Sequence, residues 1–239
     1  WILKVLEEKG ELENTIIVVT ADNGMPFPRV KGLSYEHSNH MPLAIMWKKG
    51  IKNPGKIIED YVSFTDFAAT FVDVAEFSAD ELGMKSIQGK SLTPYFKSDK
   101  NQIVDAQKDY VLLGQERHDV GRPNDTGYPV RGIVKDGFMY LINYEEKRWP
   151  AGNPETGYTN TDGSPTKTEI LELKRRGENS KYWNFNFGKH SKEELYQVSI
   201  DEDCMINLAS NADFQKIKSN LKNILESELK KQKDPRMFG

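Results

Sequence analysis

The sequence predicts an α/β fold in two parts, the second of which is an α+β subdomain with an antiparallel sheet and a terminal helix. Three observations predict it. A β-branched run over 14–20 lies between helical segments, strand pairs begin at about residue 110, and the tail over 212–231 has helical periodicity. We place 1–106 in a sheet portion and 107–239 in the C-terminal subdomain.

The first part is predicted from four segments. Residues 1–9 form a charged, amphipathic helix that Gly10 ends with a left-handed cap. The run over 14–20 has no polar alternation, which indicates a parallel strand covered on both faces, and 43–47 is a second apolar strand. Thr65 or Asp66 caps a helix that ends near Ala75. Because the chain begins in mid-helix without Met, we expect it to be cut from a longer protein.

The second part is predicted from strands over 110–114, 130–134 and 138–143. Asp136-Gly137 is a strong two-residue hairpin signal between the last two. Residues 145–192 are rich in Gly, Pro, Asn and aromatic residues, which is typical of a long ordered loop. The tail is expected to dock through one apolar helix face, formed by Phe214, Ile217, Leu221, Ile224, Leu225 and Leu229.

Composition excludes several classes of function. The 239 residues include 33 Lys and Arg and 36 Asp and Glu, so the net charge is -3 and no basic block predicts nucleic-acid binding. The longest apolar run is about five residues, against the roughly 20 that a membrane-spanning helix needs. Cys204 is the only cysteine, so no intrachain disulfide is possible.

The sharpest chemical signal is Thr20-Ala21-Asp22-Asn23-Gly24, directly after the first strand. Ligand sites of α/β sheets lie at the carboxyl ends of strands, and a carboxylate and an amide oxygen suit Ca²⁺ or Mg²⁺. The alternative is a simple Asp-Asn-Gly turn. Lys31 follows the rigid spacer over 25–28 and returns to the same site, unless it is an ordinary surface charge.

These segments together resemble the type I sulfatases. VVTADNGMPFPRVKGLSYEHSNHMPLAIMW is similar to the metal and sulfate motif of that family, and FTDFAATFVDVA, IQGKSLTPYF, YPVRGIV, EELYQV, DEDCMINLA and Lys233-Asp234-Pro235 are similar to its later segments. GQERHDVGRPNDTGYPVR, RWPAGNPETGY and the Pro-Phe-Pro spacer are most similar to bacterial N-sulfoglucosamine sulfohydrolases, the heparan N-sulfatases. The resemblance implies an alkaline-phosphatase-like sheet in the first part.

The resemblance also implies roles for individual residues. Asp22 and Asn23 become ligands of a divalent cation, normally calcium, and Lys31 becomes the catalytic cation that binds the sulfate. His118 and its neighbour Arg117 are placed at the substrate-recognition rim.

Three histidine assignments have alternatives. His118 pairs instead with Asp119 or Asp125 in the ordered-loop interpretation. The family's Gly-Gly-x-Arg run is replaced here by residues 37–40, so His37 is a substrate contact or a polar loop residue. We favour the loop interpretation for His40.

The sequence departs from the family at the nucleophile. Sulfatases use a formylglycine made from a C-x-P-S-R motif, which is absent here, and Cys204 is better interpreted as a small buried hydrophobe. We therefore expect the C-terminal portion of a periplasmic or secreted sulfatase, inactive by itself. Its partners are the missing N-terminal half and a sulfated glycosaminoglycan sugar, with N-sulfoglucosamine favoured.

Two other functions stay open. Trp149, Tyr158, Tyr182 and Trp183 are compatible with a non-catalytic carbohydrate-binding domain, although ordinary loop packing explains them as well. A phosphodiesterase of the same superfamily would require two metals and more histidines, whereas Asp22-Asn23 favours a single-metal site.

Overall fold

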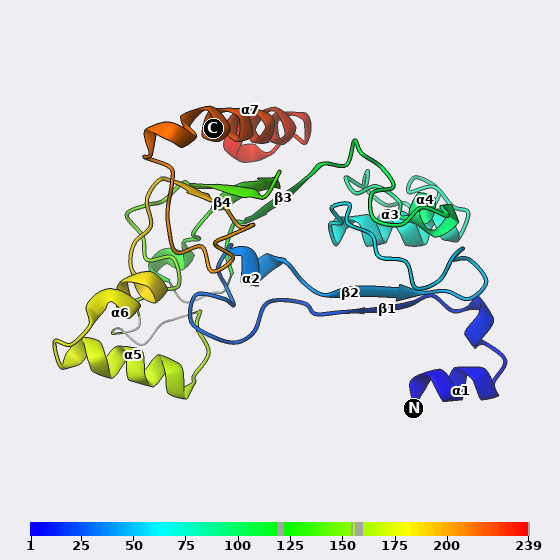
Figure 1. Ribbon diagram of the computed structural model, residues 1–239, viewed down its shortest axis with the longest axis horizontal. Helices are drawn as coiled ribbons and strands as arrows, with labels where there is room; N and C mark the ends of the chain where they lie inside the picture. Colours follow the sequence, from blue (N-terminus) through cyan, green and yellow to red (C-terminus); the bar gives the residue numbers. More distant parts are fainter. Residues whose placement is uncertain (119–121, 154, 156–159, 239) are drawn as a thin grey trace. The chain divides into compact units, whose positions relative to one another are not determined.

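The computed structural model describes residues 1–118, 122–153, 155 and 160–238, and it is a mixed α/β structure as predicted. The chain forms two compact units (Figure 1): residues 1–20 with 42–111, and residues 21–41 with 112–239. Residues 21–41 follow one strand of the first unit and precede the next, but they belong to the second unit. The contacts group residues 21–41 with the C-terminal unit. The division at 106/107 stays a prediction.

The first unit contains a two-stranded sheet and short helices. Its elements are α1 (Ile2–Glu8), η1 (Leu12–Asn14), β1 (Ile17–Thr20), β2 (Leu43–Met46), α3 (Thr65–Val74) and α4 (Thr93–Lys97). The predicted end of the first helix is confirmed, because Gly10 has a φ of 73° just beyond it.

The partner of the first strand differs from the prediction. β1 pairs antiparallel with β2, from Ile17 opposite Met46 to Thr20 opposite Leu43, and Val19 is 63% exposed. The expectation of a parallel strand covered on both faces is therefore wrong for the described sheet. A β-branched run favours extended backbone whatever direction its neighbour takes, so the run predicts the strand and not its pairing.

A small apolar core holds the helices of the first unit. Leu92, Tyr95 and Phe96 are buried and pack against Trp47 and Phe67, among others. The carboxylate of Asp66 accepts hydrogen bonds from the backbone N–H groups of Ser63 at 3.0 Å and Lys90 at 2.8 Å, and it pairs with Lys108 at 2.6 Å. Asp66 thus connects the start of α3 to two later segments. The N-cap of α3 is Phe64, without a side-chain cap hydrogen bond, so the expectation that Thr65 or Asp66 caps this helix is wrong.

The second unit is built on a four-stranded sheet, to which β3 contributes from its third residue onward. The order is β3 (Tyr110–Gln115), β4 (Val130–Lys135), β5 (Phe138–Asn143) and β6 (Glu193–Tyr196), and β4–β5 and β5–β6 are antiparallel. Asp136 and Gly137 have φ angles of 51° and 74°, the left-handed values that a tight two-residue hairpin needs. The predicted antiparallel hairpin is confirmed.

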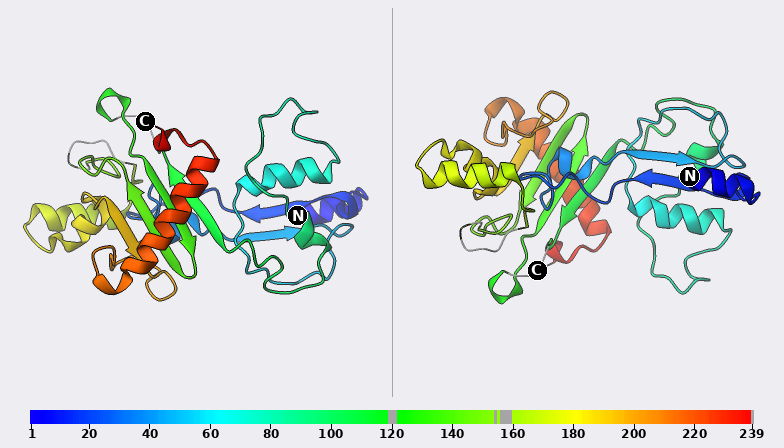
Figure 2. Two further views of the ribbon diagram at one scale, coloured as in Figure 1. Left: turned by 90° about the horizontal axis from the view of Figure 1, so that it is seen from above. Right: turned by 90° about the horizontal axis from the view of Figure 1, so that it is seen from below.

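One helix covers this sheet. α7 (Gln215–Lys231) follows η4 (Ala212–Phe214) and lies across the strands (Figure 2), with contacts to β4 and β5. Leu221, Leu225 and Leu229 are each at most 4% exposed. The predicted docking of the C-terminal helix is confirmed, and η5 (Pro235–Met237) follows it.

The expected long loop contains two helices. α5 (Pro165–Arg175) and α6 (Ser180–Phe187) pack through Ile170, Trp183 and Phe187. Ser164 caps α5 by accepting a hydrogen bond from the Lys167 N–H at 3.1 Å, and Pro165 occupies the first turn. The prediction of loop alone is wrong because the Gly- and Pro-rich residues around 150–164 obscure this short capped helix.

No helix among the described residues combines the length and apolar character that crossing a membrane requires.

Candidate functional site

A buried carboxylate attaches residues 21–41 to the sheet of the second unit. Glu194, on β6, is 3% exposed and accepts hydrogen bonds from the Tyr35 hydroxyl at 3.1 Å and the Asn143 amide at 2.5 Å. The Tyr196 hydroxyl also donates to it. We call Tyr35, Asn143, His190, Glu194 and Tyr196 the Glu194 cluster. Burying a charge is costly unless it is hydrogen-bonded, so these donors are required by Glu194.

Arg29 adds a second attachment. Its guanidinium lies 4.1 Å from the ring centroid of Tyr35 and donates to the Phe185 carbonyl at 2.8 Å and to the Cys204 carbonyl. The stacked arrangement is a favourable cation–π geometry. The segment that carries Asp22, Asn23 and Lys31 is therefore held at both its middle and its C-terminal side.

His190 completes the Glu194 cluster. Its Nε2 lies 3.2 Å from the Tyr35 hydroxyl and its Nδ1 lies 3.5 Å from the Glu194 carboxylate. Burial, which outweighs the attraction of Glu194, lowers the pKa of His190 below its ordinary value.

The two predicted metal ligands lie at the beginning of residues 21–41. Asp22 is exposed, and the Asn23 amide donates to the Gly24 carbonyl at 2.7 Å, so the side-chain oxygen is the group a cation would use. Gly24 is buried, and a Cβ there would collide with the His37 carbonyl oxygen. The turn therefore needs glycine.

The donor chemistry of Asp22 and Asn23 suits a hard cation, but calcium takes six to eight oxygen ligands. Among the residues that the structure describes, no group of three or more His, Cys, Asp or Glu side chains surrounds a metal position. This chain accordingly fits part of a calcium site, and the assignment stays a prediction.

Lys31 lies beside a carboxylate that the sequence did not predict. Its ammonium is 2.8 Å from Asp162, which precedes α5. The hydrogen bond and charge of Asp162 raise the pKa of Lys31, and the charge of Asp22 contributes. No local pattern indicates the pairing with Asp162, which is 131 residues away.

His118 also reaches the neighbourhood of Lys31. Gly32 has a φ of 80°, and a Cβ there would lie 3.2 Å from the His118 Nδ1 and 3.3 Å from the Asn160 Cβ. The predicted rim residue therefore lies against the residue that follows the predicted sulfate-binding lysine. Its role at the rim stays a prediction.

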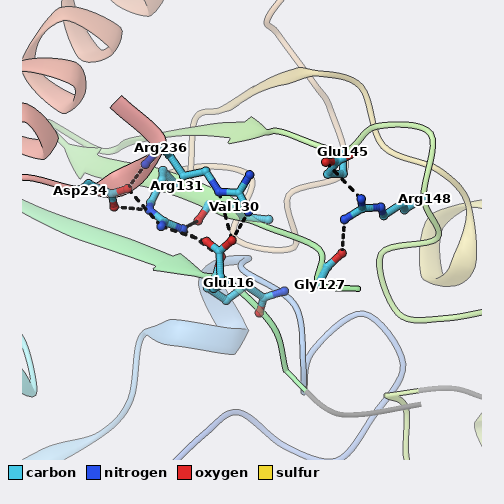
Figure 3. Close-up of polar contacts among 9 residues, drawn as sticks. Glu116, Gly127, Val130, Arg131, Glu145, Arg148, Asp234 and Arg236 are labelled. Atoms are coloured by element: carbon cyan, nitrogen blue, oxygen red, sulfur yellow. Dashed lines mark hydrogen bonds and ion pairs between the residues drawn. The ribbon is translucent and has the colours of Figure 1, made fainter. Parts of the chain in front are cut away.

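An ion-pair cluster fixes the start of the segment that carries Arg117 and His118 (Figure 3). Glu116 pairs with Arg131 at 3.0 Å and with Arg236, while Arg131 also pairs with Asp234 at 2.6 Å. We call these four residues the Glu116 cluster. Although burial opposes it, the hydrogen bonds from Arg236 and Arg131 hold the pKa of Glu116 below its usual range. The far end is held where Arg148 donates to the Gly127 carbonyl at 2.8 Å.

The remaining sequence candidates have protein partners. Arg117 pairs with Asp125, and His37 lies 3.1 Å from Asp203. His40 pairs with Glu36 at 2.6 Å, as suits a loop residue. Asp119, one proposed partner of His118, lies outside the described residues.

Arg122 and Cys204 are both buried within the protein. Arg122 is buried and donates to the carbonyls of Trp149 at 3.1 Å and Pro150 at 2.5 Å, which ties its loop to a neighbouring turn. Cys204 is fully buried, and burial raises the pKa of its thiol to about 12. The interpretation of Cys204 as a buried hydrophobe is confirmed, since a thiol of that pKa is almost never the nucleophilic thiolate.

The aromatic residues weighed as a sugar-binding surface are packed together. Trp149 and Trp183 meet edge to face with ring centroids 5.6 Å apart, and Trp183 is 7% exposed. Tyr182 is 47% exposed, and Tyr158 lies outside the described residues. The two tryptophans therefore support the packing interpretation.

We predict that His190 makes the second unit less stable in acid. Its lowered pKa means that the unfolded chain takes up a proton below about pH 6.5 and the folded chain resists it, so stability is lost as pH falls. The expected loss is up to about 1.4 kcal/mol for each pH unit below that point. Urea unfolding at pH 7.5 and 5.5 measures it.

The control is His190→Gln, which keeps a polar partner for Tyr35 and cannot titrate. Its free energy of unfolding should change less between the two pH values than that of the original chain. An equal change in both proteins would contradict the prediction.

Comparison with known proteins shows which family and which proteins the chain is similar to. Residues 2–77 match the sulfatase family model. The chain is 27% identical over 219 residues to an ulvan-active sulfatase of Formosa agariphila, covering 90% of this chain and 33% of that protein. It is 26% identical over 231 residues to human N-sulphoglucosamine sulphohydrolase, covering 94% and 43%. A Bacteroides thetaiotaomicron N-acetylglucosamine-6-O-sulfatase is 36% identical over 111 residues, covering 45% and 19%.

Solved structures agree on the fold. A protein in complex with its substrate D-glucosamine-2-N,6-O-disulfate superposes with a TM-score of 0.64 at 22% identity, covering 100% of this chain and 39% of that one. A 2-O glycosaminoglycan sulfatase gives a TM-score of 0.62 at 19% identity, covering 98% and 40%. The chain thus spans less than half the length of each of these relatives, and the alkaline-phosphatase-like fold expected from the sequence is confirmed.

Proposed function

Because this chain is a relative of the sulfatases, we propose that it is the C-terminal part of a hydrolase that removes sulfate from a sulfated sugar, with N-sulfoglucosamine of heparan or heparin as the substrate. The observation that supports this most directly is the position of His118, which comes from a distant segment, against Gly32, the residue that follows Lys31. An ammonium and an imidazole on adjoining segments suit the binding of an anionic sugar.

Each residue has a defined task in this proposal. Lys31 neutralises the charge that develops on the sulfuryl oxygens, and His118 and Arg117 contact the sugar. Asp22 and Asn23 contribute oxygen ligands to calcium, which would supply further positive charge to those oxygens. For an N-sulfated sugar, water cleaves the S–N bond and releases sulfate and a free amine.

The nucleophile has to come from elsewhere. The chain contains no C-x-P-S-R motif, so we propose that an N-terminal sulfatase half supplies the formylglycine, in a periplasmic or secreted protein. His37 is a further substrate contact in this proposal, reached when its pairing with Asp203 opens.

The calcium assignment predicts a specific loss of metal affinity. In the protein that includes the nucleophile segment, Asp22→Ala with Asn23→Ala should abolish tight calcium binding, because two oxygen ligands are removed. Isothermal titration with calcium measures it. Asp99→Ala with Asn220→Ala removes the same two group types from exposed positions and should have no effect. Full affinity in the first variant would refute the assignment.

The chain alone should show no sulfatase turnover. Removing a covalent nucleophile forfeits nearly all of the rate acceleration, and the remaining binding groups recover only a small part. Release of sulfate from an aryl sulfate by the purified chain, free of host sulfatases, is the measurement. Turnover that co-purifies with the chain and is lost in Lys31→Ala would overturn this expectation.

The N-sulfate assignment predicts substrate preference. The protein that includes the nucleophile segment should have a higher kcat/KM for N-sulfated than for 6-O-sulfated glucosamine. His118→Ala should reduce the discrimination by about 1–3 kcal/mol, because the substrate group that pairs with His118 in the complex is left without its partner. His40→Ala, an exposed histidine, is the matched control. Preference for the 6-O-sulfate would refute the N-sulfate assignment and leave the family unaffected.

A further inference from the structure

We propose that Asp162 is a sugar-recognition residue that exchanges partners when substrate binds. Without substrate its carboxylate is the counter-ion of Lys31. When a sulfate group takes that place, Asp162 is released and accepts a hydrogen bond from a hydroxyl or N–H group of the attached sugar. The inference rests on the proposed role of Lys31 in sulfate binding.

The geometry of the ion pair allows such an exchange. The Lys31 ammonium and the Asp162 carboxylate are 2.8 Å apart, and their side chains remain 28% and 46% exposed. An ion pair this accessible to water contributes little to stability, and a ligand can reach it. By contrast, the pair of Arg131 and Asp234 has only 14% of each side chain exposed.

The charges around Asp162 suit an anion at this position. A sulfate bound to Lys31 would place its oxygens where the Asp162 carboxylate oxygens lie. The Asp162 carboxylate therefore indicates a position for an anion. A second ammonium is nearby, because Lys167 donates to the Thr161 carbonyl at 2.8 Å and the charge of Asp162 acts on it. Burial nevertheless lowers the pKa of Lys167, and Asp162 opposes this.

Electrostatics requires Asp162 to move when sulfate arrives. Two anions beside one ammonium repel each other, and the exposed carboxylate is the one that is free to rotate. Once rotated, it is an acceptor next to a sugar ring that carries several donors. The His118 ring and Asn160 flank Gly32, the residue that follows Lys31.

The alternative is that Asp162 only occupies the anion position and never contacts the sugar. The two possibilities predict different responses of Asp162→Asn in the full chain. We would measure the affinity for inorganic sulfate and for glucosamine N-sulfate by isothermal titration or by NMR.

Asp162→Asn should bind inorganic sulfate about 2- to 5-fold more tightly, because a competing charge is removed. If removal of the charge were the only effect, the affinity for glucosamine N-sulfate would rise by the same factor. We expect that affinity to be about 2- to 10-fold lower than this, because the acceptor for the sugar is weakened. The ratio of the two affinities therefore shifts toward inorganic sulfate. An equal gain for both ligands would overturn the inference.

Controls separate this inference from the proposed function. Asp136→Asn makes the same charge change in the β4–β5 turn, where Asp136 pairs with Lys135, and should leave both affinities unchanged. Asp162→Ala should reproduce the shifted ratio, and a thermal melt checks that each variant folds. If Lys31→Ala leaves sulfate binding unchanged, the role of Lys31 fails. If Lys31→Ala weakens binding but Asp162→Asn does not shift the ratio, only the present inference fails.

Discussion

The burial of the Glu194 carboxylate is the constraint on which the second unit depends. A charge that is 3% exposed has to be satisfied by donors, and the structure recruits them from β5, from β6 and from residues 21–41. Tyr35 is the donor from the last of these segments, and Arg29 stacks on its ring. The excursion that carries the candidate site residues is thus ordered by a charge located on a strand more than 150 residues later.

Ion pairs in this unit differ in their exposure, and exposure separates two kinds of role. The Arg131–Asp234 pair is largely shielded, so breaking it would leave a costly uncompensated charge. It therefore acts as a fixed support for Glu116 and the segment after it. The Lys31–Asp162 pair is open to water, where exchange of one anion for another costs little. The described residues of this unit thus include both a shielded ion pair and pairs that are open to water, such as Lys31–Asp162.

The two units also differ in how their apolar surface is used. In the second unit, α7 covers the sheet and the large side chains of β4 and β5 are buried. In the first unit, several large apolar residues remain exposed, including Val19 at 63% and Phe71 at 48%.

The features that could be predicted from the sequence are those that short-range chemistry controls. The Asp136-Gly137 hairpin, the Gly10 cap and the C-terminal helix each depend on backbone preferences or periodicity within a few residues. The family resemblance depended on motifs of the same local kind, and it was confirmed over residues 2–77 by the family model.

Which distant groups meet depends on how the folded chain packs. The antiparallel partner of β1, the pairing of Lys31 with Asp162, and the approach of His118 to Gly32 join residues that no local pattern relates. Any surface lysine has many carboxylates of equal chemical suitability along the chain. The choice among them is made by the packing of the Glu194 cluster and the capped start of α5, which place Lys31 and Asp162 2.8 Å apart.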